Sequence, residues 1–128
     1  MGFDQYHEPP EELSQETRTL ARMFASLTEE AEAINWYEQR LSVEADSDAR
    51  RIIEDARHEE YKHFAMDFEF LLRKRPEWRS IAQGVLFRSG DITENADAAE
   101  EGAEVDEDED GGGSPDASLG IGDLRRAS

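Results

Sequence analysis

Cysteine is absent from the 128 residues of this chain, which excludes disulfides, thiolate zinc sites and cysteine-ligated iron–sulfur clusters. Any metal must then be held by Glu, Asp or His, and these ligands suit iron, manganese or zinc rather than copper(I). Long apolar runs are also missing, because no stretch approaches the ~18 consecutive apolar residues of a membrane-spanning helix. The first residues contain no basic segment followed by an apolar run. We therefore expect no signal peptide, no membrane partner and a cytoplasmic protein.

Basic residues are scarce and unevenly distributed. Residues 1–90 carry 19 acidic and 12 basic side chains, whereas residues 91–128 carry 13 and 2, so the two parts have net charges of −7 and −11 and the whole chain −18. Such a chain is a poor candidate for binding nucleic acid, which requires Lys and Arg beside the phosphates, but it suits the attraction of cations. No aromatic residue follows Phe87, so only residues 1–90 can build a substantial core.

Apolar residues within positions 1–90 recur with a helical period, which predicts an all-α domain. We expect a first helix over residues 10–45, a second over residues 48–73, and a short third helix from Pro76 to about residues 84–87. Only a few residues join the two long helices, so they should form an antiparallel hairpin. A single hairpin leaves one apolar flank exposed, and dimerisation into a four-helix bundle would cover that flank.

The C-terminal third of the chain has a different composition. Residues 91–117 are acidic, small and glycine-rich, which predicts a disordered linker. Residues 118–128 bring back three aliphatic side chains, Leu119, Ile121 and Leu124, spaced by glycine. A purely disordered tail has little reason to carry that pattern, so we treat these residues as a separate terminal segment.

Three ionisable residues fall on the predicted core faces: Glu30 in the first helix, and Glu60 and His63 in the second. At 100° per residue each lies within or beside its apolar stripe, and Glu30 precedes the turn by about as many residues as Glu60 follows it. A buried carboxylate must be paired, hydrogen-bonded, protonated or bound to a cation. A two-metal site in a bundle core takes one Glu from each of two helices and a Glu-x-x-His from each of the other two, so this chain offers half of such a site. The alternative is a local hydrogen-bonded pair of Glu60 and His63 at a helix interface.

Further polar and aromatic residues surround this group. Tyr37 follows Glu30 by seven residues on the same helical face, and Asp67, one turn beyond His63, is a candidate hydrogen-bond partner for the imidazole. His58 projects to the opposite side of its helix and is expected to be a surface residue.

Glu29, Glu32 and Trp36 project from the back of the first helix, one above another. They form either a solvated acidic face with an incidental Trp, or a weak cation site that lies outside the buried group.

Residues 7–87 resemble the encapsulated ferritins, two-helix relatives of ferritin that are cargo of encapsulin shells. The resemblance rests on three segments, namely His7 to Pro9, Glu29 to Arg40, and Glu59 to Met66. It implies a ferritin-like four-helix bundle formed by a homodimer, with dimers closing into an open decameric ring. It also implies a ferroxidase, which oxidises Fe(II) to Fe(III) with O₂.

The resemblance assigns roles to individual residues. Glu30, Glu60 and His63 would be the iron ligands of a di-iron site with two irons per dimer, and Tyr37 would hydrogen-bond within that site. Glu29, Glu32 and Trp36 would line the surface site through which metal is taken up. Asp67 departs from the family pattern, in which a small or neutral residue is expected.

The terminal segment Ser118 to Arg126 resembles the targeting peptide of encapsulin cargo. Its three aliphatic side chains would enter an apolar groove on the inner shell wall, although Asp123 replaces the commoner Ser. The linker then serves as a tether, and the protein is expected inside an encapsulin nanocompartment, where the shell stores the iron mineral.

Two other functions remain open at the level of sequence. A rubrerythrin-like relative would use the same site to reduce peroxide, but the chain lacks the cysteines of a cysteine-ligated iron centre. A non-catalytic helical adaptor would use only the acidic linker and the docking peptide.

Overall fold

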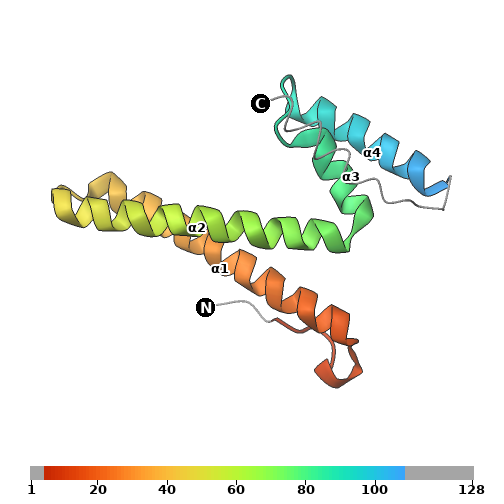
Figure 1. The fold of residues 1–128 in the computed structure, drawn as a ribbon, viewed down its shortest axis with the longest axis horizontal. Coiled ribbons are helices and arrows are strands. Elements are labelled where there is room, and N and C mark those ends of the chain that lie inside the picture. Colours follow the sequence, from red (N-terminus) through yellow and green to blue (C-terminus); the bar gives the residue numbers. More distant parts are fainter. Residues whose placement is uncertain (1–4, 109–128) are drawn as a thin grey trace. The chain divides into compact units, whose positions relative to one another are not determined.

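A computed structural model describes the backbone of residues 5–108 and the side chains of residues 5–103. Those residues form a short 3₁₀ helix and four α-helices, without a β-strand: η1 (Pro10–Glu12), α1 (Gln15–Val43), α2 (Ser47–Lys74), α3 (Pro76–Val85) and α4 (Ile92–Asp108) (Figure 1). The predicted all-α class is therefore confirmed. The terminal segment 118–128 and residues 109–117 of the predicted linker lie outside the described residues.

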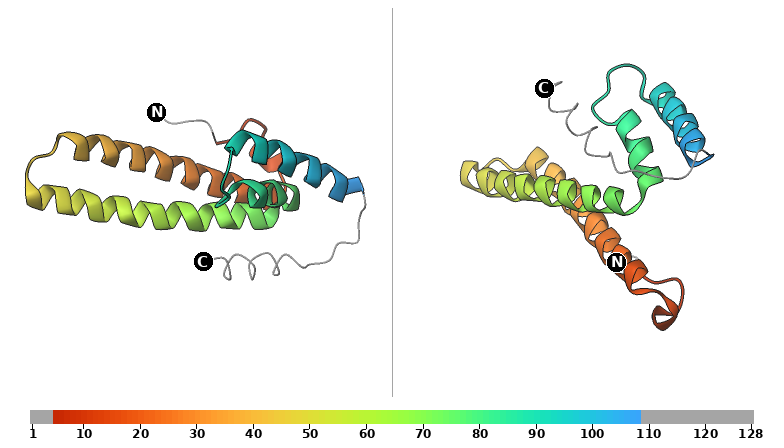
Figure 2. Two further views of the ribbon diagram at one scale, coloured as in Figure 1. Left: turned by 90° about the horizontal axis from the view of Figure 1, so that it is seen from above. Right: turned by 45° about the vertical axis from the view of Figure 1, so that its right-hand side comes forward.

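The chain divides after Arg75 into two compact units. In the first unit, α1 and α2 run antiparallel and are joined by a tight turn, as Figure 2 shows in both views. Side-chain caps fix both helix starts, because the Ser14 hydroxyl accepts from the Thr17 N–H at 3.1 Å and the Asp46 carboxylate accepts from the Ala49 N–H at 2.9 Å. Each cap satisfies an N–H that the helix itself leaves free.

Arg50 connects the two helices at the turn. Its Nη1 donates to the backbone carbonyls of Leu41, at 2.6 Å, and Glu44, at 3.0 Å. These carbonyls lie at the C-terminal end of α1, where an α-helix has unpaired acceptors and a partial negative charge. The first turn of α2 therefore caps the last turn of α1, which fixes how the two helices are aligned.

The hairpin buries few side chains completely. Its buried apolar residues are Leu20 and Leu41 of α1 together with Leu71 and Leu72 of α2. Several large apolar side chains stay exposed, among them Phe24 at 41%, Ile52 at 70% and Met66 at 55%. The sequence-based expectation that one hairpin leaves an apolar flank uncovered agrees with these exposures, and the dimer that would cover it stays a prediction.

The second unit differs from the sequence-based expectation. Residues 92–108, predicted as part of a disordered linker, form α4, which packs against α3. Helix-favouring Ala and Glu residues make up much of this segment. The Asp91 carboxylate caps its start by accepting from the Glu94 N–H at 2.9 Å. Its half-buried or buried side chains Ala96, Ala99 and Ala103 recur at helical spacing.

Small residues allow α3 and α4 to approach closely. A Cβ atom at Gly84 of α3 would overlap the Cβ of Ala99 in α4. The connecting loop reverses the chain through two residues with positive φ, Phe87 at 62° and Gly90 at 97°. The acidic composition of the segment does not indicate this contact, because Gly84 and Ala99 lie in different helices and meet only in the folded chain.

Among the described residues, no helix is both long enough and apolar enough to cross a membrane.

Candidate metal centre

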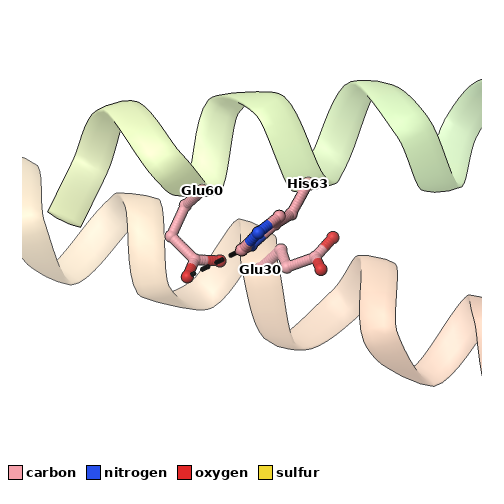
Figure 3. Close-up of side chains that lie close together, drawn as sticks. All are labelled: Glu30, Glu60 and His63. Atoms are coloured by element: carbon pink, nitrogen blue, oxygen red, sulfur yellow. Dashed lines mark ion pairs between the residues drawn. The ribbon is translucent and has the colours of Figure 1, made fainter.

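Glu30 of α1 and Glu60 and His63 of α2 meet between the two long helices (Figure 3). One ligand atom from each side chain lies within 4.8 Å of the corresponding atoms of the other two. All three residues are half-buried. Among the described residues, no other three His, Cys, Asp or Glu side chains lie close enough together to hold one ion. The structure therefore brings together the residues that sequence analysis singled out.

Glu60 and His63 form an ion pair when His63 is protonated, but they do not form a hydrogen bond (Figure 3). Their i, i+3 spacing places both on one face of α2, but the Nδ1 of His63 and the Oε1 of Glu60 are 3.8 Å apart. That distance is beyond a hydrogen bond. The Glu60 oxygen and the His63 nitrogen are thus both available as ligands of one ion.

The Glu30 carboxyl group lies in an unfavourable environment for its charge. Burial raises its pKa from 4.5 to about 7, and the neighbouring carboxyl groups of Asp67, Glu60 and Glu29 add to this effect. Its Oε2 is buried and has no hydrogen-bond partner among the described residues. A carboxylate without a donor is costly in a protein interior.

A bound cation would relieve this cost. Two carboxylates and an imidazole are ligands that suit iron, manganese or zinc, and a positive ion would provide the partner that the Glu30 oxygen lacks. The residues present therefore fit a metal ion, and they supply both oxygen and nitrogen donors.

Asp67 differs from its expected role as a partner of His63. It is buried, with only 9% of its surface exposed, and its carboxyl group helps to raise the pKa of Glu30. No hydrogen bond joins Asp67 to His63 among the described contacts. The helical spacing predicted the face of α2 on which Asp67 lies, but not that its carboxyl group interacts with Glu30.

The remaining candidate residues lie outside this group of three. Tyr37 is half-buried on α1, and the Cζ of Arg40 lies 5.6 Å from the centre of its ring. Glu29, Glu32 and Trp36 are exposed, with 50% of the Trp36 surface accessible. The structure thus places these three on the exposed face of α1.

Sequence analysis missed a polar contact that holds the helices near the site. Glu38 of α1 accepts hydrogen bonds from Arg57 at 2.7 Å and from the Tyr61 hydroxyl at 3.2 Å, both on α2. The guanidinium of Arg57 also lies 5.7 Å from the centre of the Tyr61 ring. Because Tyr61 directly follows Glu60, this contact helps to keep the α2 ligands opposite Glu30.

Several known proteins are similar to this chain in sequence. The family described as EncFtn-like matches residues 5–89. An encapsulated ferritin-like protein of Rhodospirillum rubrum is 40% identical over 121 residues, which cover 93% of this chain and 86% of the relative. A ferritin-like protein of Thermotoga maritima is 42% identical over 101 residues, covering 79% and 89% of the two chains.

A solved structure supports the same relationship. The crystal structure of a protein from Nitrosomonas europaea aligns with a TM-score of 0.67 and 38% identity, covering 70% of this chain and 99% of that one. Together these similarities show that the chain belongs to the EncFtn-like family of encapsulated ferritin-like proteins.

Proposed function

We propose that the protein is a ferroxidase that takes Fe(II) as its substrate and transfers electrons from it to O₂, leaving Fe(III). The observation that carries this proposal is the meeting of Glu30, Glu60 and His63, whose ligand atoms lie within 4.8 Å of one another. This mixed carboxylate and imidazole set suits iron. Membership of a ferritin-like family makes iron the metal of choice.

The site is completed by a second copy of the chain. One chain supplies one Glu and one Glu-x-x-His, whereas a two-metal carboxylate centre uses two of each. His63 is 42% exposed at its side chain, and Ile52 and Met66, which share its side of α2, are 70% and 55% exposed. Burying this flank against its own copy would cover the apolar surface and bring two half-sites together, holding two irons per dimer. The dimers would then close into a decameric ring.

The residues of the site contribute in different ways. Glu60 and His63 stand on one rigid helix and set the spacing of the ligands, while Glu30 approaches from the other helix. Glu30 must be ionised to bind a cation, so binding releases its proton wherever the carboxyl group is still protonated. Carboxylates can also change the number of oxygens that they offer as the charge on iron rises. Tyr37, on the same face of α1, is the proposed hydrogen-bonding neighbour of the site.

The exposed carboxylates of Glu29 and Glu32 beside Trp36 would serve as the uptake site. They adjoin Glu30 in sequence on a strongly acidic molecule, and such a surface raises the local concentration of cations. Their carboxylates would meet those of another copy within the assembly.

Storage would take place outside the bundle. The Rhodospirillum rubrum relative is named an encapsulated ferritin-like protein, and Ser118 to Arg126 resembles a targeting peptide for an encapsulin shell. We propose that this segment anchors the protein inside such a nanocompartment and that the shell retains the oxidised iron.

The function is tested by adding Fe(II) in air and following ferric absorbance and oxygen uptake. We expect Glu30→Ala and His63→Ala to lose most of the rapid oxidation because each removes a ligand. Glu54→Ala and His58→Ala are matched controls, since both residues are exposed on α2, and both should oxidise iron like the wild type. Circular dichroism would verify that each variant keeps its helices. Wild-type rates in both ligand variants would refute the proposed site.

A further inference from the structure

Asp67 is the one charged residue that is buried among the described residues of the hairpin, and the proposed reaction does not use it. It is 9% exposed, and its Oδ2 has no hydrogen-bond partner among the described residues. A buried carboxylate without a donor costs free energy, so we look for a group that could compensate the charge of Asp67 within α2 or beside it.

The position of Asp67 relates it directly to the metal ligands. It follows Glu60 by seven residues and His63 by four, so all three lie along one face of α2. In Figure 3 the Glu30 carboxyl group points along the helices away from the Glu60 carboxylate, toward the turn of α2 that follows His63. Asp67 follows His63 by one turn of α2, on the side toward which the Glu30 carboxyl group points.

The two facing carboxyl groups share the same deficiency. Glu30 Oε2 and Asp67 Oδ2 are both buried and without a donor, although the two groups are close enough to interact through a hydrogen bond. Two carboxylate oxygens are both acceptors, so a hydrogen bond between them requires a proton. A cation between them would satisfy both oxygens at once and remove the repulsion between two negative charges.

We propose that Glu30 and Asp67 form a second cation position, built only from oxygen ligands, which adjoins the Glu30–Glu60–His63 position and shares Glu30 with it. This inference rests on the proposed function, because it assumes that Glu60 and His63 hold a metal ion. An all-oxygen set suits hard cations such as Mn(II), Mg(II) and iron better than a set that contains imidazole. An iron ion that becomes harder on oxidation thus has an oxygen-only position beside the one at which it reacts.

Anomalous diffraction from crystals of the full chain soaked in Mn(II) tests the position directly. We expect one Mn(II) peak at Glu60 and His63 and another between Glu30 and Asp67. Asp67→Asn should lose only the second peak. Asp55→Asn makes the same substitution at an exposed site of α2, and it should keep both.

The outcomes separate this proposal from the proposed function. A peak at Glu60 and His63 with none at bonding distance from Asp67 would overturn the second position and leave the ferroxidase site intact. An absence of Mn(II) at both places would overturn both. A peak between Glu30 and Asp67 that persists in Asp67→Asn would also overturn it, because the aspartate would then not be a ligand.

Binding in solution gives an independent readout. Titration of the metal-free protein with Mn(II), followed by calorimetry and by the loss of the free-ion electron paramagnetic resonance signal, should count one fewer ion per chain in Asp67→Asn than in wild type. His63→Ala should weaken the first position and retain the ion at Asp67. Equal stoichiometry in wild type, Asp55→Asn and Asp67→Asn would contradict the proposal.

Discussion

Individual carboxyl groups decide the chemistry of this hairpin. Glu30 and Asp67 each have a buried oxygen without a donor among the described residues, and burial raises the pKa of Glu30. A chain selected only for stability would carry apolar residues at such positions. The cost is instead consistent with residues kept for binding a cation.

The raised pKa of Glu30 leads to a pH dependence. Because this pKa is about 7, the carboxyl group is mostly protonated below that pH and must lose a proton before it can bind a metal. We expect the apparent affinity for Mn(II) to fall about tenfold for each pH unit below 7 and to level off above it. Calorimetric titrations on either side of pH 7 measure this dependence. Glu30→Gln cannot exchange a proton there, so its weaker binding should lose this part of the slope; an unchanged slope would contradict the assignment.

Asp67→Asn should stabilise the metal-free protein, because the amide removes a buried negative charge beside Glu30 and can donate a hydrogen bond. The expected gain is on the order of 1 kcal/mol in the free energy of unfolding. Chemical denaturation of the chelator-treated protein checks it, with Asp55→Asn expected to lie within about 0.5 kcal/mol of wild type. A less stable Asp67→Asn would show that the carboxylate has a favourable partner in the metal-free state.

At this scale the sequence could predict which face a residue occupies but not its neighbours. Glu30, Glu60 and His63 were found because their positions relative to the turn place them level in an antiparallel hairpin. The carboxyl group with which Asp67 interacts, that of Glu30, could not be predicted, because side-chain direction depends on the packing of α1 against α2. The contact of Arg57 with Glu38 was missed for the same reason.

Among the elements, the two long helices follow from a regular apolar period, whereas α4 combines local helix signals with a contact to α3. A regular apolar period predicts both long helices, and α2 nearly matches the expected residues 48–73, whereas α1 begins at Gln15, after the Ser14 cap, and not at residue 10. The acidic composition of residues 91–117 suggested disorder instead. Its first part, residues 92–108, is nevertheless helical. The contact of Ala99 with Gly84 joins two helices, so the composition of this segment alone could not predict it.

Arg50 supplies a test of how the hairpin turn is held. Arg50→Ala removes the donor to the carbonyls of Leu41 and Glu44, so we expect a loss of about 1 kcal/mol in the free energy of unfolding. Arg51→Ala changes the adjacent, exposed arginine of the same helix and should cost about 0.5 kcal/mol or less. Urea denaturation of both variants measures the difference, and equal losses would contradict a specific capping role for Arg50.

Two glycines provide a matched pair for the second unit. Gly84→Ala introduces a Cβ that overlaps Ala99, whereas a Cβ at Gly102 meets nothing within 4 Å. We expect Gly84→Ala to separate α4 from α3 and to accelerate amide hydrogen exchange in α4. Gly102→Ala should slow that exchange, because alanine favours a helix by about 1 kcal/mol over glycine. Unchanged exchange in Gly84→Ala would show that the helices do not pack as described.

For the whole molecule, the exposed flank beside His63 predicts self-association. Met66 lies one turn after His63 and is 55% exposed, so Met66→Glu should place a charge in the proposed dimer contact. We expect this variant to remain monomeric with Fe(II) present, while the wild type forms dimers or larger species; analytical ultracentrifugation distinguishes them. Val43→Glu, at an 83% exposed position at the end of α1, is the control and should assemble normally. Dimers of Met66→Glu would place the contact elsewhere.

The sequence of one chain could predict the need for a partner by counting ligands, because half of a two-metal site was present. It could not predict how the copies meet. That depends on which apolar residues remain uncovered after α1 and α2 have packed, and the exposure of Ile52 and Met66 emerges only from the folded hairpin.

Helix α4 shortens the stretch of chain that follows α3. Extended, its 17 residues would span about 55 Å, but as a helix they measure about 25 Å, and α4 also packs back against α3. Release of α4 as an extended chain would therefore roughly double the length of residues 92–108. The packing of Ala99 on Gly84 thus sets the length of chain that separates α3 from residue 109.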